Sequence, residues 1–308
     1  MEIFTQGTVI CMKKGDAVVK ECLRDYGEQL YRVDYNGANK ILVWISHTSW
    51  CRQYYQNVQN IVNIGNIYEG FLWPEDISEM HDDKFGYIVS IISKDYVPMY
   101  EILALKHNLN YKVLVAASIH LAKAVSSLSK YGLVIYGFTS FNIDISKGEI
   151  LIPMDATACV PSETKLAWID NPRYTAPEVA LGAPMNLYSN RFILANLIFQ
   201  LLFFSHPLEG IRSLAPMNTD LQMKIYAEEP VFIFDREDDI NKPHPVIQKN
   251  TILLWERAPA FVKDIFWRAF DKDAIKNLSH RPTEKDFLYV LKEFYSVLSN
   301  KDRWEKIM

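Results

Sequence analysis

Apolar and polar positions alternate along the first hundred residues in the manner of β-strands. The run Tyr31–Tyr35 alternates, Asn36-Gly37 is a dipeptide typical of tight turns, and residues 40–45 form a β-favouring apolar run. These features predict a hairpin whose second strand is buried. A further strand-like run covers residues 85–92, and helical spacing of apolar residues covers 51–64. The first hundred residues therefore predict a small sheet accompanied by one helix.

From about residue 100 onward the apolar positions recur at helical spacing. Two short β segments are expected near residues 143–145 and 150–152, with Lys147-Gly148 as the turn between them. Long helices are predicted over about 111–130, 189–204, 259–271 and 283–299. We find no internal repeat and no Gly/Ser linker. The pattern predicts an α+β protein with a small β-rich lobe, about residues 1–92, and a larger α-helical lobe, about 93–308.

Composition narrows the function classes. Apolar residues make up 49% of the chain, which is enough for a large core, and the net charge of −4 argues against a nucleic-acid binder. The four cysteines form no C-x-x-C pair, which favours free thiols in a reducing cytosol. The longest apolar run, residues 192–204, is shorter than the roughly 20 residues that span a bilayer, and no secretory signal is apparent. We expect a cytoplasmic protein that is not inserted in a membrane.

One segment makes the architecture recognisable. Tyr174-Thr-Ala-Pro-Glu178-Val resembles the A-P-E motif that closes the activation segment of protein kinases. Asp155 lies 13 positions after Asn142, and each matches a position that kinases use for metal ligation. Arg281 follows at the distance where kinases place the arginine that pairs with the A-P-E glutamate. The resemblance implies a single bilobal protein-kinase-like domain over residues 1–308, with Glu178 and Arg281 as a structural ion pair.

Four further segments are distinctive: Phe71-Leu-Trp-Pro74, His206-Pro-Leu-Glu-Gly210, residues 229–235 and residues 238–243. They resemble a narrower bacterial kinase-like family. Its members occur beside von Willebrand A-type proteins and PP2C-type phosphatases in tellurite-resistance-associated operons. The resemblance implies that one of these two kinds of protein is the partner.

Most of the groups that phosphoryl transfer requires are missing from the matching positions. Counting back from Asn142, the catalytic aspartate of H-R-D-x-x-x-x-N falls on Gly137, or on Phe138 in a shorter loop, and neither can accept a proton. Val43 stands in the place of the lysine that holds the α- and β-phosphates. By the alternation of strand side chains, Lys40 faces the opposite side, so we favour a solvated lysine over a substitute phosphate ligand.

The neighbouring motifs are equally incomplete. The segment that should hold a glycine-rich loop keeps only Gly27, and the helix over residues 51–64 contains no glutamate to pair with a lysine. Asp155 is followed by Ala and Thr rather than by the Phe-Gly of D-F-G. Asn190 stands where kinases place the aspartate that anchors the catalytic loop, so that charge is absent too.

The leading hypothesis is a pseudokinase that binds a protein partner as a regulator or scaffold, without phosphoryl transfer and without a required cofactor. One alternative is an atypical Ser/Thr kinase that uses Lys40 and Asp155 with metal-ATP. Another is a nucleotide-binding switch in which Asp155 and Asn142 hold the metal and nucleotide without chemistry. For Asp155 and Asn142 themselves, hydrogen bonding to the loop backbone is the competing structural interpretation.

Overall fold

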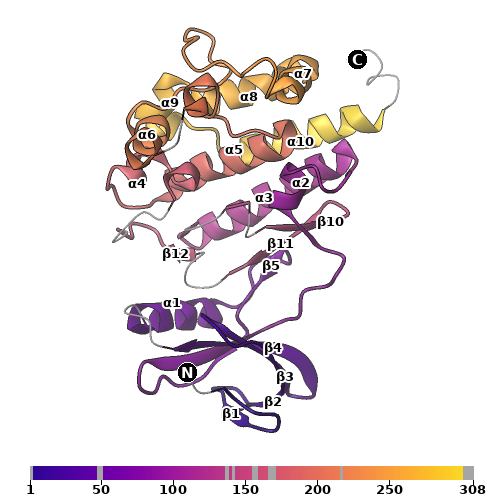
Figure 1. Cartoon of the computed structure of the whole chain (residues 1–308), viewed down its shortest axis with the longest axis vertical. Coiled ribbons are helices and arrows are strands. Elements are labelled where there is room, and N and C mark those ends of the chain that lie inside the picture. The colour runs from indigo at the N-terminus through magenta and orange to yellow at the C-terminus, as the bar shows by residue number, and fades with distance from the viewer. Residues whose placement is uncertain are drawn as a thin grey trace. The chain divides into compact units, whose positions relative to one another are not determined.

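The structure is a computed structural model that describes residues 3–46, 51–135, 139–140, 143–154, 159–165, 171–215 and 218–300. It divides into two compact units, drawn in Figure 1. The N-terminal unit comprises Met1–Tyr96 together with Leu151–Cys159, and the C-terminal unit comprises Val97–Ile150 with Val160–Met308. The sequence placed the boundary near residue 92 and did not predict that residues 151–159 belong with the first unit.

A six-stranded antiparallel sheet dominates the N-terminal unit. The order of its strands is β1-β2-β3-β4-β7-β6. An isolated bridge joins Met12 to Ser78, and the amide of Lys13 donates to the carbonyl of Ile77 at 3.0 Å, so the two outer strands meet and the sheet curls on itself. The strand bounds are Val9–Cys11 (β1), Asp16–Arg24 (β2), Gln29–Tyr35 (β3), Ala38–Ser46 (β4), Asp76–Ile77 (β6) and Lys84–Val89 (β7).

The predicted hairpin is confirmed as β3 and β4. Asn36 and Gly37 both adopt positive φ values, 52° and 79°, the backbone of a two-residue type I′ turn whose twist matches the paired strands. The strand expected over residues 85–92 is shorter than predicted, because β7 ends at Val89.

The two faces of β4 pack against different clusters. Val43 and Ile45 face the helix α1, Cys51–Ile64, in one buried cluster. Leu42 points the other way, into a cluster with residues of β2 and β3 such as Tyr31 and Val33. Figure 1 shows α1 lying along this sheet. Period-2 alternation therefore decides which β4 side chains can meet the helix.

Further strand pairs complete the β structure of the described residues. In the N-terminal unit, β5 (Phe71–Leu72) runs parallel to the last residues of β11 (Glu149–Pro153). In the C-terminal unit, β8 (Val97–Pro98) is antiparallel to β10 (Asp144–Ser146), and β9 (Leu133–Ile135) lies beside β12 (Cys159–Pro161).

The C-terminal unit is built around the helix α5, Leu187–Phe203. Asn186 caps its start through a capping box with Ser189, and Phe204 ends it in the left-handed conformation with φ 54°. Nearly every residue of α5 is buried, as its all-round apolar sequence predicts. Phe199 packs against several rings from later in the chain, including Phe232 and Phe266.

The helices around α5 correspond closely to the predicted ones. The structure matches the expected helix at 111–130 and differs by one or two residues at the ends of the others. It adds α7 and several short helices that the periodicity did not indicate. The bounds are Met99–Leu103 (α2), Tyr111–Lys130 (α3), Pro177–Ala180 (α4), Thr219–Met223 (α6), Lys249–Arg257 (α7), Ala260–Phe270 (α8), Lys272–Lys276 (α9) and Glu284–Ser299 (α10).

Within the described part of the chain, no helix combines the length and the apolar character needed to cross a membrane.

Candidate functional site

The β4 position that the kinase resemblance assigns to the phosphate lysine lies in an apolar environment. Val43 is 7% exposed and belongs to the cluster that β4 and β7 form with α1. The buried face of α1 consists of Cys51, Tyr54, Val58, Ile61 and Val62. An ammonium group in this cluster would lose its hydration and find no carboxylate on the buried face of α1. The side chains around Val43 therefore form part of the hydrophobic core and do not form an anion-binding site.

Lys40 lies on the opposite side of β4, as the alternation predicts, but it is not a solvated lysine. Its ammonium nitrogen is 2.6 Å from a carboxylate oxygen of Glu75 and 3.0 Å from the hydroxyl oxygen of Ser90. Ser90 in turn donates to the same Glu75 oxygen at 2.7 Å. The Lys40 side chain is only 21% exposed. The solvated interpretation is therefore wrong, and Lys40 is engaged in a local ion pair instead of being free to reach a phosphate.

The turn between β2 and β3 carries the single glycine that remains of a glycine-rich loop. Gly27 has a φ of 62°, and a Cβ built there would have nothing within 4 Å. Glycine is therefore favoured here because of its positive φ, and not because another group comes too close to allow a side chain. The neighbouring Tyr26 is 72% exposed.

Three positions that sequence reasoning singled out, Gly137, Asn142 and Asp155, lie outside the described residues, as does Phe138. Among the residues that are described, no three His, Cys, Asp or Glu side chains gather in a way that could hold a metal ion. Metal-ATP is the group that the kinase resemblance implies, but Val43 and the uncharged buried face of α1 do not fit its phosphates.

Asn190 anchors the strand before the catalytic-loop position although it carries no charge. Its side-chain oxygen accepts from the amide of Ile135 at 2.7 Å, and its side-chain nitrogen donates to the carbonyl of Leu133 at 3.1 Å. An amide offers both an acceptor and a donor, whereas an ionised carboxylate only accepts. The sequence indicated the absent charge, but it did not indicate that anchoring of β9 would be retained.

Glu178 and Arg281 are brought together although they are 103 positions apart in the chain. The guanidinium donates to both carboxylate oxygens, at 2.9 and 2.8 Å, and also to the carbonyls of Tyr188 and Ala274, each at 3.1 Å. Side-chain exposure is 1% for Arg281 and 14% for Glu178. This is a fork-to-fork pair in which the buried charge has partners on several sides.

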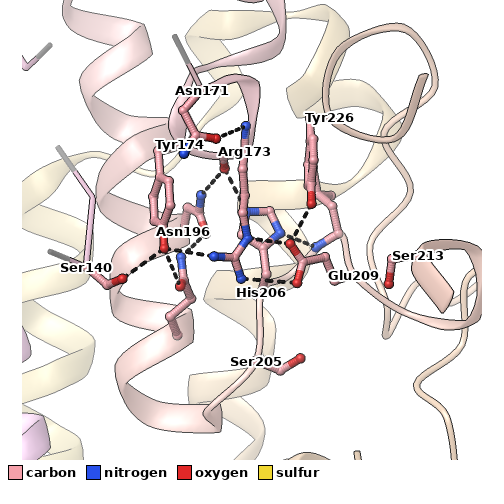
Figure 2. Close-up of polar contacts among 12 residues, drawn as sticks. Ser140, Asn171, Arg173, Tyr174, Asn196, Ser205, His206, Glu209, Ser213 and Tyr226 are labelled. Atoms are coloured by element: carbon pink, nitrogen blue, oxygen red, sulfur yellow. Dashed lines mark hydrogen bonds and ion pairs between the residues drawn. The ribbon is translucent and has the colours of Figure 1, made fainter. Parts of the chain in front are cut away.

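A second network, shown in Figure 2, surrounds Arg173 in the residues just before the Ala-Pro-Glu motif. Arg173 donates to both carboxylate oxygens of Glu209, with 3.1 Å between Nη2 and Oε2. The hydroxyl of Tyr226 donates to Glu209 at 2.6 Å. The backbone carbonyl of Arg173 accepts from the side chains of His206, at 2.8 Å, and Asn196, at 3.1 Å.

Tyr174 extends this network towards α5. Its hydroxyl lies 3.0 Å from the hydroxyl of Ser140 and donates to Gln200 at 3.4 Å, while Arg173 donates to it at 3.0 Å. Gln200 then donates to Asn196 at 2.9 Å. The hydroxyl of Tyr174 is therefore held inside the C-terminal unit, and the whole residue is 4% exposed.

Protonation states in this network follow from burial and charge. Burial lowers the pKa of His206 to about 4, so its ring is neutral at pH 7; its Nδ1 then accepts from the amide of Leu208 while Nε2 donates to the Arg173 carbonyl. Burial alone would raise the pKa of Glu209, but a charge on His206 and the Arg173 guanidinium lower it to about 2. Burial, reinforced by the Glu209 charge, raises the pKa of Tyr226. The ion pair between Arg173 and Glu209 is therefore charged on both sides at pH 7.

Sequence reasoning did not predict this network. It noted His206 and Glu209 only as parts of a family-like segment, although His206 is 1% exposed. The available signal was the position of Arg173 directly before the recognisable motif. Its partner Glu209 is 36 residues away, and no local pattern links the two.

Comparison with known proteins supports the fold. No protein-family model matches the chain, and no curated protein matches it. Among solved structures it is similar to the PknI kinase domain of Mycobacterium tuberculosis. One crystal structure has a TM-score of 0.61 at 15% identity over 96% of this chain and 100% of that one. Another has a TM-score of 0.58 at 16% identity over 95% and 99%. The chain has the bilobal α+β fold of protein kinases.

Proposed function

We propose that this protein is a pseudokinase, a kinase-like scaffold that binds a protein partner and does not transfer phosphate. The observation that carries the proposal is Val43, buried with α1 residues at the position of the phosphate lysine. A lysine there is one of the few groups on which phosphoryl transfer depends, and its absence alone slows such chemistry by orders of magnitude.

Two further features support the proposal. Lys40, the nearest lysine on the same strand, is paired with Glu75 on the other face of the sheet. Gly137 occupies the matching position of the catalytic aspartate in the sequence and has no group that can accept a proton. A chain with the kinase fold but without the catalytic base and the phosphate-binding lysine lacks two of the charged groups on which phosphoryl transfer depends.

A transfer assay tests the absence of chemistry. Purified protein is incubated with radiolabelled ATP and Mg²⁺ or Mn²⁺, with and without a generic acceptor protein. We expect no incorporation above that of Asp155→Ala. Incorporation that Asp155→Ala abolishes would overturn the proposal in favour of the atypical kinase.

A thermal-shift titration separates the nucleotide switch from the scaffold. A ligand at a hundredfold excess over its Kd stabilises a protein by about 2.7 kcal/mol, which raises the Tm by several degrees. We expect no shift with millimolar Mg-ATP. A shift that Asp155→Ala removes, without turnover, would support the switch.

The family resemblance supports a protein partner of the von Willebrand A type or the PP2C phosphatase type. Each candidate, purified from the same genomic neighbourhood, can be titrated into this protein by calorimetry. We expect micromolar or tighter binding of one of them without added nucleotide. A strict requirement for Mg-ATP, or binding of neither, would contradict the scaffold role.

A further inference from the structure

The residues around the Ala-Pro-Glu motif are held at two points by arginine–carboxylate pairs. Arg173 is paired with Glu209, and five positions later Glu178 is paired with Arg281. Both pairs are bidentate, which fixes orientation as well as distance. The stretch from 171 to 178 is thus tied at its start and at its end to parts of the C-terminal unit remote in sequence.

The same stretch is also ordered by local contacts. The side chain of Asn171 accepts from the amide of Arg173 at 3.2 Å, and the hydroxyl of Thr175 donates to the Asn171 carbonyl at 2.9 Å. Pro172 and Pro177 restrict the backbone further. Nothing in these contacts requires a ligand or a modification.

Segments of this kind are commonly switched by phosphorylation, because an added phosphate attracts an arginine and orders the chain. Here the anion that pairs with Arg173 is a carboxylate already present in the sequence. The hydroxyl of Tyr174 is enclosed by Ser140 and Gln200, so a phosphate there would disrupt the network instead of completing it.

We propose that the Arg173–Glu209 pair is a built-in lock that holds residues 171–178 in one position without phosphorylation. Glu209 is itself oriented by the Tyr226 hydroxyl, and the Arg173 backbone is oriented by His206 and Asn196. These residues position the segment and have no catalytic task. The inference does not depend on the proposed function, since an active kinase could carry the same lock.

Hydrogen exchange on the full chain tests the lock. The protein is treated with a non-specific phosphatase, and intact mass confirms that it carries no phosphate. We expect peptides covering 171–178 to stay protected. Glu209→Gln keeps the shape of the side chain and removes its charge. It should raise exchange in this stretch at least about tenfold while α3 remains protected.

Two variants sharpen the result. Glu229→Gln is the matched control, because it removes an exposed ion pair with Arg212 in the same unit and should leave exchange at 171–178 unchanged. Tyr226→Phe removes one hydrogen bond to Glu209 and should raise exchange by a smaller factor. It also serves as the test if Glu209→Gln does not fold.

Three results would overturn the proposal. One is rapid exchange of the stretch in the unphosphorylated wild-type protein. Another is unchanged exchange in both Glu209→Gln and Tyr226→Phe. The last is an equal loss of protection in α3 with Tyr226→Phe, which would make the pair a general element of stability and not a local lock.

Discussion

The two units of this protein differ in how far their described arginine–carboxylate pairs are enclosed. In the N-terminal unit, the β4 position that faces α1 is filled by Val43, and the ion pairs of the strands are at least partly exposed, such as Arg32 with Glu21. In the C-terminal unit, Arg281 is 2% exposed and fully paired. The enclosed charges are those that join distant backbone segments.

The sharpest test of the contrast is Arg281→Ala. Glu178 would be left enclosed without its partner, and breaking a buried pair on one side typically costs about 3–5 kcal/mol. We expect a loss of that size in the free energy of unfolding, measured by urea denaturation.

The matched control for Arg281→Ala is Arg32→Ala, which breaks an exposed pair and should cost less than about 1 kcal/mol. Similar losses in the two variants would remove the distinction between the units.

The pH dependence of stability is expected to come mainly from the C-terminal unit. The pKa of His206 is lowered from 6.5 to about 4, so between these values the unfolded chain binds a proton that the folded chain does not. The contribution of neutral His206 to the free energy of unfolding is therefore fully present above pH 6.5. It is lost as the pH falls towards 4, and the loss is on the order of 3 kcal/mol. The lowered pKa of Glu209 continues the loss below about pH 4.5.

Urea denaturation at pH 7.0, 5.5 and 4.5 measures this slope. His206→Gln removes the titrating group and should flatten the profile between pH 6.5 and 4.5. An unchanged slope in that variant would show that other groups carry the acid sensitivity.

Asn190→Asp restores the residue type that kinases carry at this position. In this chain we expect it to destabilise the protein by about 1–3 kcal/mol, because the carboxylate cannot donate to the Leu133 carbonyl and is fully buried. Thermal unfolding measures the change, with the exposed amide Asn250→Asp as its control. A gain in stability would contradict the inference that the Asn190 amide suits its hydrogen-bond partners better than a carboxylate would.

The smallest effect is expected for Lys40→Met. Its pair with Glu75 is partly exposed, so we expect a change of about 1 kcal/mol or less in the free energy of unfolding. Any thermal shift with Mg-ATP should be the same in this variant and in the wild-type protein. A shift that disappears in Lys40→Met would favour the atypical kinase.

Local pattern was sufficient for most of the secondary structure. The type I′ turn at Asn36-Gly37 and the helix α3 follow from turn chemistry and from periodicity, which depend on neighbours in the chain. The extent of β7 was overestimated, because the residues after Val89 have strand-like composition but pair with no strand among the described residues.

The candidate site was only partly accessible from sequence. Motif spacing led to Glu178, Arg281 and Val43, because each sits at a fixed offset from a recognisable segment. The partner of Lys40 was missed, since Glu75 comes next to it only when β4 and the segment at the start of β6 both pair with β7.

By itself, the sequence determined the class of fold, the hairpin and long helices, and the absence of a lysine at the β4 position facing α1. These depend on the order and type of residues, which periodicity and motif spacing report directly. Only the tertiary structure decided that Arg173 and Glu209 become paired and largely enclosed. This pair joins residues 36 positions apart that no motif links, and its strength comes from burial, a property that no local pattern contains.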